Sequence, residues 1–340
     1  MNGDDRRAVV LGFAGAGVLI VVLLMLVDVN RVKTAIGRAD PVLLAVTLGF
    51  ALVWLLAWAG TLRTVLATMD VTVSLPTSFL VYAAAVFANN VTPFGQAGGE
   101  PVTALLVSNV TGTRYERGLV SIASVDVLNV VSSVGIVFLA VGVYASSVTL
   151  GTELNAAVGS VIVLVVAIVV TFTLVWRHRD ALVDRIAGPI AGGLDRVRWG
   201  PFTSLTVTED EIVDRMERFF GNVEVVATDR RRLALALTLS TAGWLLQAAA
   251  LLAAFAAVGH DVPVVVALFV IPLANLAGMT PLPGGLGGIE AAFVGLLVPI
   301  TGIEAAVVTA AVLVFRVAIY WMPVALGGVS ATAYGVDVMA

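Results

Sequence analysis

Four charged side chains lie within otherwise apolar stretches of the sequence and are the first candidates for chemistry: Glu100, Asp126, Glu290 and Arg316. Inside a bilayer each would cost on the order of 2.5–3.5 kcal/mol even on a lenient scale, so each should face a partner or water. One interpretation is structural, with Arg316 paired to Asp126 or Glu290. The other is a lipid-headgroup site, in which Arg316 holds a phosphate and the carboxylates face an amine or couple to ions or protons.

Neutral polar side chains near these charges could complete such a site. Asp126, Asn129 and Ser133 fall at i, i+3 and i+7, so a helix that carries them would have one polar face. Arg316 and Tyr320, four residues apart, share a helix face in the same way. The predicted substrate-binding side chains are Asn89, Asn90, Gln96, Glu100, Asp126, Asn129, Asn275, Glu290, Arg316 and Tyr320.

Other kinds of chemistry find little support in the residue types. The chain has no cysteine, which excludes disulfides and thiolate metal sites, and its only histidines are His178 and His260. An intramembrane aspartyl protease needs two facing aspartates, and Asp126 alone lies within an apolar run; no nucleophile–base pair is visible. We therefore predict no enzymatic activity, no cofactor, no metal and no nucleic-acid partner.

The elements that must position these residues are membrane helices. The 340 residues are 59% hydrophobic and only 12% charged, with a mean hydropathy of +1.03, whereas soluble domains carry roughly a quarter charged residues. We predict one all-α polytopic membrane domain over residues 1–340, with about eight transmembrane helices. The nearly charge-free runs cover 8–27, 41–62, 71–99, 118–150, 155–176, 233–258, 262–289 and 303–334.

Two of these runs carry matching motifs, which indicates an internal repeat. Thr92–Glu100 (TPFGQAGGE) resembles Thr280–Glu290 (TPLPGGLGGIE). A Thr-Gly pair falls eleven residues after each glutamate, and a charge inside an apolar helix falls twenty-six residues after it. The repeat halves are predicted around 71–150 and 262–334; the matched positions are Thr111-Gly112 with Thr301-Gly302, and Asp126 with Arg316.

The motifs themselves predict broken helices. Proline removes a backbone donor and glycine favours non-helical turns, so the interrupted helix survives in hydrocarbon only where protein or a water-filled cavity surrounds it. Paired breaks are typical of a transporter's binding site, and packing kinks are the alternative. We expect the two segments close together at membrane depth, as re-entrant or half-helix segments. Whether they cross or re-enter stays open, as does the orientation of the N-terminus. The breaking residues are Pro93, Gly98, Gly99, Pro281, Pro283, Gly284, Gly285, Gly287 and Gly288.

One polar stretch, residues 177–232, interrupts the apolar pattern. It holds ten arginines, so the positive-inside rule places it in the cytoplasm. Within it, Thr208–Phe220 has a capping box and an apolar stripe, which predict an amphipathic helix lying on the headgroups. The alternative is a surface that docks a soluble enzyme.

These motifs also carry a family resemblance. TPFGQAGGE, the following VTGTRYERGLVSIASVDVL, and PLPGGLGGIE with its downstream LVFRV resemble the flippase-like family named for the transmembrane region of lysylphosphatidylglycerol synthases. The resemblance implies translocation of a phospholipid or lipid-linked intermediate between leaflets of the cell membrane, without the soluble transferase or glycosyltransferase domains of some relatives. It does not identify the lipid. The alternatives are a non-transporting scaffold for a soluble lipid-modifying or glycosylation enzyme and, more remotely, an intramembrane enzyme.

Overall fold

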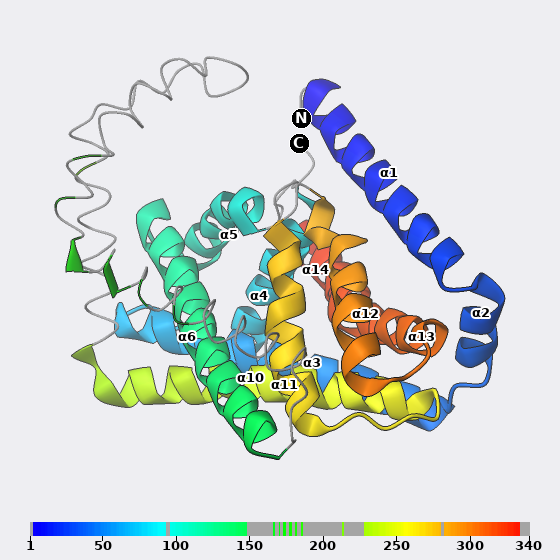
Figure 1. Ribbon diagram of the computed structural model, residues 1–340. Helices are drawn as coiled ribbons and strands as arrows, with labels where there is room; N and C mark the ends of the chain where they lie inside the picture. The colour runs from blue at the N-terminus through cyan, green and yellow to red at the C-terminus, as the bar shows by residue number, and fades with distance from the viewer. Residues whose placement is uncertain are drawn as a thin grey trace.

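A computed structural model describes residues 3–92, 96–147, 228–279 and 282–333, together with isolated positions between 166 and 213. Its described elements are all helical (Figure 1). The helix expected over 155–176 and the amphipathic helix expected over 208–220 lie almost wholly outside the described residues.

Two long antiparallel helices form the base of the fold as drawn in Figure 1: α3 (Pro41–Thr68) and α10 (Arg230–Ala257). Each begins at an aspartate whose carboxylate accepts from backbone N–H groups of the first turn, the usual N-cap arrangement. The helices pack along their length, and close approach is possible because Gly243 faces an indole: a Cβ there would lie 2.0 Å from Trp58 Nε1. The amide of Asp40 donates to the carbonyl of Ala257 at 2.9 Å, which brings the start of α3 to the end of α10.

The first broken segment is a helical hairpin made of α4 (Leu75–Val91) and α5 (Gln96–Thr111). Its two helices pack tightly, since a Cβ on Gly99 would lie 2.0 Å from the side-chain oxygen of Asn89. The next helix, α6 (Tyr115–Ser147), starts beside the end of α3; there the Ser121 hydroxyl lies 3.7 Å from the sulfur of Met69. The hairpin therefore leaves from and returns to the same end of the α3–α10 pair.

The second broken segment enters from the opposite end of that pair. It comprises α11 (Val264–Asn275), two 3-10 turns, η1 (Leu276–Met279) and η2 (Pro283–Gly285), and α12 (Gly288–Thr301). Only a short connection separates the end of α10 from the start of α11, and the residues that follow α12 contact α2, which itself leads into the start of α3. Both limbs of this hairpin therefore attach at the end where α3 begins.

The final apolar segment, which carries Arg316, is not uniformly α-helical. It consists of α13 (Ala305–Arg316), a π-helical turn η3 (Val317–Trp321) and α14 (Met322–Ala333). The α14 helix packs directly against α4, where a Cβ on Gly327 would lie 2.0 Å from the carbonyl oxygen of Ala83.

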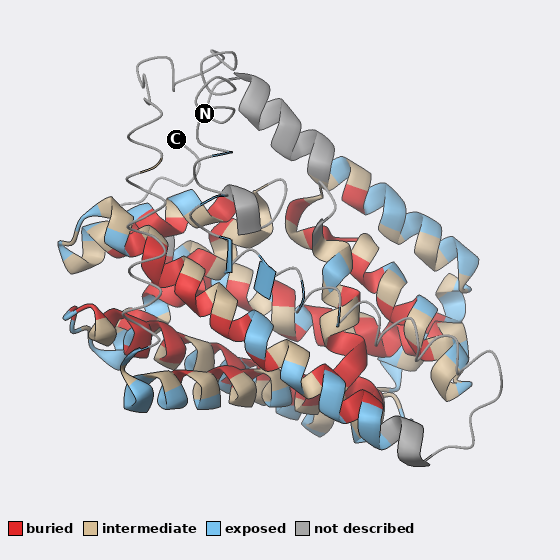
Figure 2. Cartoon of the chain, turned by 60° about the vertical axis from the view of Figure 1, so that its left-hand side comes forward, coloured by how far each residue is buried: buried red, intermediate tan, exposed pale blue. Residues whose placement is uncertain are grey.

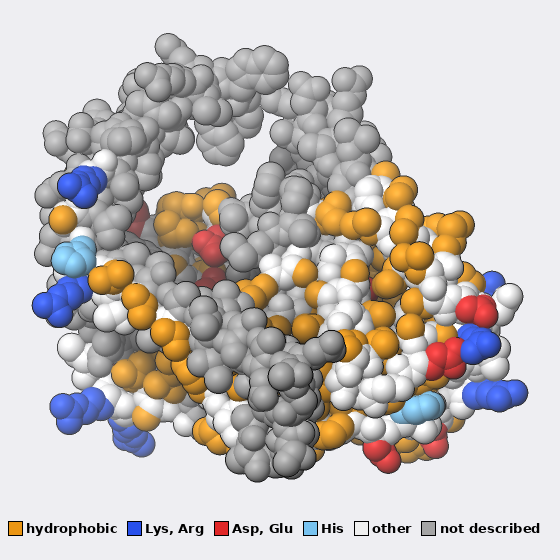
Figure 3. Space-filling view, viewed as in Figure 1, with side chains coloured by type: hydrophobic (Ala, Val, Ile, Leu, Met, Phe, Trp, Pro, Cys, Tyr) orange, Lys and Arg blue, Asp and Glu red, His pale blue; other side chains and the backbone are white. Residues whose placement is uncertain are grey.

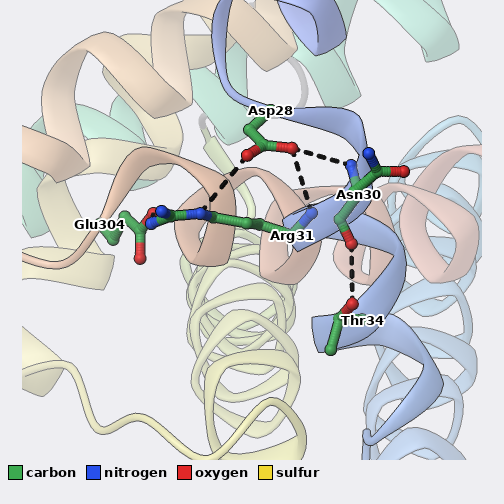
Figure 4. A network of polar contacts seen from close by, with 5 residues as sticks. All are labelled: Asp28, Asn30, Arg31, Thr34 and Glu304. Carbon is green, nitrogen blue, oxygen red and sulfur yellow. Dashed lines mark hydrogen bonds and ion pairs between the residues drawn. The ribbon is translucent and has the colours of Figure 1, made fainter.

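The N-terminal segment bends sharply after its first helix. The α1 helix (Gly3–Leu26) matches the span expected at 8–27, but the chain then turns by 91° into α2 (Val29–Gly37), which the sequence analysis did not predict. Figure 4 shows the polar contacts at this bend. The Asp28 carboxylate caps α2, and the Arg31 guanidinium bonds both Asp28 and Glu304, the residue that precedes α13.

The described residues contain five helices long and apolar enough to cross a membrane, or six if the bent pair α1–α2 counts as one. The predicted count of about eight is therefore not confirmed. The polytopic all-helical membrane class is confirmed: many large apolar side chains are exposed, as along α1 and α3, and exposed and buried residues share the same helices (Figure 2). Figure 3 shows Lys and Arg side chains gathered at the left edge, and charges of both signs at the right edge.

Candidate functional site

A buried ion pair joins the second hairpin to α13. The Arg316 Nε donates to Glu290 Oε1 at 2.6 Å, and the two side chains are 8% and 2% exposed. The second carboxylate oxygen of Glu290 accepts from the backbone N–H of Gly287 at 2.6 Å, and Arg316 Nη2 donates to the carbonyl of Gly284 at 3.3 Å. Of the two carboxylates considered from the sequence, Glu290 is thus the partner of Arg316, and Asp126 is not.

Tyr320 links this ion pair to the first hairpin. Its ring lies 4.7 Å from Arg316 Cζ, a cation–π distance, and its hydroxyl donates to the carbonyl of Asn90 at 3.0 Å. Gly284 has a φ of +54°, and a Cβ there would lie 2.3 Å from Tyr320 Cε2 and 3.0 Å from the side-chain oxygen of Asn90. The second glycine-rich segment therefore contacts the end of α4, two residues before the first glycine-rich segment begins.

A second polar cluster, which we call the acidic cluster, lies on the first hairpin and α6: Asn89, Glu100 and Asp126. The side-chain oxygen Oδ1 of Asn89 and the carboxylate oxygen Oδ2 of Asp126 are buried, and neither has a hydrogen-bond partner among the described residues. Glu100 and the phenol of Tyr82 both lie within electrostatic range of Asp126. Leaving a buried polar group without a hydrogen bond destabilises a fold by about 1–3 kcal/mol. These two oxygens therefore favour binding of a polar ligand such as water, a cation or a headgroup.

The polar face predicted for α6 links the acidic cluster to α10, because Asn129 interacts with the phenol of Tyr82, which lies beside Asp126. Asn129 turns toward α10, where its side-chain oxygen accepts from the Ser240 hydroxyl at 2.6 Å and its carbonyl accepts from Trp244 Nε1 at 3.0 Å. Ser133 is directed elsewhere and donates to the carbonyl of Val130. Asn129 therefore ties α6 to α10, and its side-chain oxygen already has a partner.

The glycines of the second motif have clear backbone roles. Gly285 and Gly287 have φ values of +63° and +83°, and a Cβ at either would lie 2.6 Å from another atom. Pro283 is buried in η2, and Gly288 begins α12. Asn275 is half-buried at the end of α11. Several predicted positions lie outside the described residues or have undescribed side chains: Pro93, Gln96, Gly98 and Pro281.

Sequence reasoning missed two contributors to this region. Tyr82 stands within an apolar run and gave no signal of its own, yet it is buried beside Asp126. The aromatic cluster of Trp54, Trp58 and Trp244 was also missed. The Trp58 ring packs edge-to-face with Trp54 at a centroid distance of 5.2 Å and with Trp244 at 5.4 Å, so the cluster joins α3 to α10. Among the described residues, no group of three or more His, Asp or Glu side chains could hold a metal ion.

An apolar groove of about 680 Å³ runs between α6, α10 and α11. Its walls are almost wholly hydrocarbon, including Leu139, Leu245 and Leu268, and its polar groups come mainly from Ser132 and Thr241. The Thr241 hydroxyl donates to the Ser132 hydroxyl at 3.3 Å, so these groups satisfy each other. The groove has the dimensions and chemistry for an acyl chain.

The fold and site together define an all-helical integral membrane protein, with two broken helical hairpins that meet around buried polar residues. The family-level comparison agrees: the chain belongs to the family of the lysylphosphatidylglycerol synthase transmembrane region, whose match covers residues 9–327. It is 29% identical over 338 residues to a UPF0104 membrane protein of Methanothermobacter thermautotrophicus, covering 98% of this chain and 95% of that one. A second protein of that name and organism is 28% identical, with 94% of each chain covered. A UPF0104 membrane protein of Pyrococcus horikoshii is 23% identical, with 92% of each chain covered.

Proposed function

We propose that this protein translocates a phospholipid or lipid-linked intermediate between the leaflets of the cell membrane, and that it is not an enzyme. The observation that carries the proposal is the acidic cluster. Oxygens of Asn89 and Asp126 are buried and have no hydrogen-bond partner among the described residues, in a protein whose main solvent is lipid. Polar and ionisable groups within a membrane destabilise the fold, and where they occur they mark substrate or ion pathways.

The arrangement of the hairpins supports the same function. Each motif region follows one order: helix, break, short helix, then a helix that carries a charged residue within its apolar sequence. Both short helices end in Thr-Gly, and the glycines Gly112 and Gly302 have φ values of +66° and +68°. Because the hairpins enter from opposite ends of the α3–α10 pair, we propose an inverted-topology repeat, in which both glycine-rich segments re-enter. Inverted repeats with broken helices at the midplane are common in secondary transporters.

The contacts support different roles for the charged residues. Arg316 already donates to Glu290 and to a backbone carbonyl, so in the proposed mechanism it holds the second hairpin in place and does not bind phosphate. The acidic cluster would receive the polar part of the substrate, and its charge suits an amine-bearing headgroup or an exchanging cation or proton. The apolar groove between α6, α10 and α11 would take an acyl chain.

A leaflet-resolved assay tests the proposal. The full chain is reconstituted into vesicles that hold trace phospholipids with fluorescent headgroups, and an impermeant reductant bleaches the outer leaflet. We expect wild-type protein to expose the inner-leaflet label faster than protein-free vesicles do. Asp126→Asn and Glu100→Gln should slow exposure at least about tenfold, the effect of losing roughly 1.4 kcal/mol of binding.

Ser133→Ala is the matched control, since Ser133 lies on the same helix and, among the described residues, its hydroxyl bonds only the backbone carbonyl of Val130. It should leave the rate unchanged. Wild-type rates equal to those of empty vesicles for anionic, zwitterionic and amine-bearing probes would refute translocation. Unchanged rates in both acidic variants would remove the acidic cluster from the mechanism.

A further inference from the structure

The end of the α3–α10 pair where α10 begins carries a second groove, distinct from the apolar groove and from the acidic cluster. It has a volume of about 410 Å³ and lies between α3 and α10. Both of its walls contribute an arginine, Arg63 from α3 and Arg232 from α10. We call it the arginine groove.

The two arginines are held in place mainly by neutral groups. Arg63 Nε donates to the carbonyl of Val73 at 3.0 Å, and Arg232 Nη1 donates to the carbonyl of Ala67 at 2.5 Å. Carbonyls orient a guanidinium without cancelling its charge. Asp229 lies 3.4 Å from Arg232 Nε, but both side chains are about 40% exposed, so this contact is partly screened by solvent. Within the described part of the chain, Arg63 has no carboxylate partner.

The apolar lining continues inward from both arginines in the same order. Along α3 the groove passes from Arg63 to Gly60 and Leu56, and along the antiparallel α10 it passes from Arg232 to Leu235 and Leu239. Gly60 lines the groove where α3 approaches α10, and an added Cβ there would lie 3.2 Å from Leu239 Cδ1. Charge at the rim and hydrocarbon toward the membrane interior match the shape of an amphiphile.

We propose that the arginine groove binds an anionic phospholipid, with its phosphate between Arg63 and Arg232 and one acyl chain along Leu56, Leu235 and Leu239. The described residues near this end, including Arg114, Arg117, Arg230 and Arg231, are rich in arginine, which places the groove in the cytoplasmic leaflet by the positive-inside rule. The proposal does not depend on translocation, because it uses neither the acidic cluster nor the hairpin contacts.

Native mass spectrometry of the full chain, titrated with phosphatidylglycerol or phosphatidylcholine of equal acyl length, tests the site. Wild-type protein should bind its first phosphatidylglycerol more tightly than phosphatidylcholine, and more weakly as salt rises. Arg63→Gln and Arg232→Gln should each weaken phosphatidylglycerol binding about fivefold, the usual effect of one basic residue near a membrane surface. Leu56→Trp, which fills the apolar part, should weaken binding of both lipids.

Arg230→Gln is the matched control, because Arg230 lies at the same end of α10 as Arg232 and has an exposed side chain, but does not line the groove. It should change affinity less than about twofold, since surface charges contribute little. Millimolar inorganic phosphate should not displace the lipid, because the ion lacks an acyl chain. Equal affinity for the two lipids in wild-type protein, displacement by phosphate, or equal losses in Arg230→Gln and Arg63→Gln would each overturn the proposal. The wild-type comparison needs no variant to fold.

Discussion

Tyr320 donates its hydroxyl hydrogen to the carbonyl of Asn90, 3.0 Å away, and this bond joins the final segment of the chain to the first broken hairpin. The carbonyl belongs to the last turn of α4, where backbone acceptors lack partners within the helix. A side chain from the C-terminal segment therefore completes the end of an N-terminal helix, and the two halves stabilise each other.

Tyr320→Phe removes that bond and keeps the ring on Arg316. We expect a loss of about 1–3 kcal/mol in stability, because the partly buried Asn90 carbonyl loses a donor. The measurement is the unfolding temperature in detergent. Trp321→Phe is the control, since Trp321 is adjacent but 49% exposed; a drop there as large as in Tyr320→Phe would argue against a specific role for the hydroxyl.

Breaking the Arg316–Glu290 pair should be costly, whereas removing both charges should not be. Arg316→Gln leaves the Glu290 carboxylate buried without its counter-ion, which typically costs 3–5 kcal/mol. Arg316→Gln combined with Glu290→Gln should recover most of that loss, as a double-mutant cycle of unfolding temperatures would show. Full transport in the double variant would establish a purely structural role for the pair. Lost transport with restored stability would instead show that Arg316 takes part in substrate binding.

Gly284→Ala should be among the most damaging small substitutions. The new Cβ would lie 2.3 Å from Tyr320 Cε2, at a φ of +54° that side chains rarely adopt. Gly49→Ala is the matched control, since a Cβ there has nothing within 4 Å and α3 favours alanine. We expect strongly reduced folded yield for the first variant and unchanged or increased yield for the second; similar yields would contradict the tight contact.

Cysteine labelling decides whether the hairpins re-enter, because the chain has no native cysteine. Thr72→Cys and Arg114→Cys flank the first hairpin, and His260→Cys and Ile303→Cys flank the second. In intact cells an impermeant maleimide should label only the second pair. A crossing segment would instead split the members of one pair between the two sides of the membrane.

The Arg31–Glu304 contact should contribute little, although it joins α2 to the start of α13. Both side chains are more than half exposed. Exposed pairs typically contribute less than about 1 kcal/mol, and salt screens them. Glu304→Gln should therefore barely change the unfolding temperature, and the small difference from wild type should vanish in high salt; a loss as large as that of Arg316→Gln would be incompatible with its exposure.

The sequence predicted the residues around the breaks better than their geometry. Motif spacing identified Glu290 and Arg316, and the free-energy cost of a charge inside the membrane predicted that Arg316 has a partner. Spacing alone could not choose between Glu290 and Asp126, since that choice depends on how α12 turns at Gly287. Hydropathy located α1 and α3, but not the 91° bend at Asp28, because a polar cap inside a short amphipathic stretch has little effect on hydropathy.

Helical periodicity predicted one polar face on α6 but could not predict which residue Asn129 bonds. The i, i+3 spacing placed Asn129 beside Asp126, but the neighbouring helix decided its partner: Ser240 on α10 offers a hydroxyl at 2.6 Å. The substrate roles of the remaining polar residues stay predictions, as does the internal repeat. The direction of each hairpin could not be read from hydropathy, since a broken run of about thirty residues fits one crossing or one return equally well.

The π-helical turn between α13 and α14 has a mechanical consequence. A π turn holds one more residue than an α turn, and one residue corresponds to about 100° of rotation. The halves of this single segment can therefore be set at independent rotational phases, one with Arg316 toward Glu290 and the other with Gly327 against Ala83. Deleting one residue from Val317–Trp321 would force a single rotational phase on both halves, so this segment should be sensitive to changes in its length.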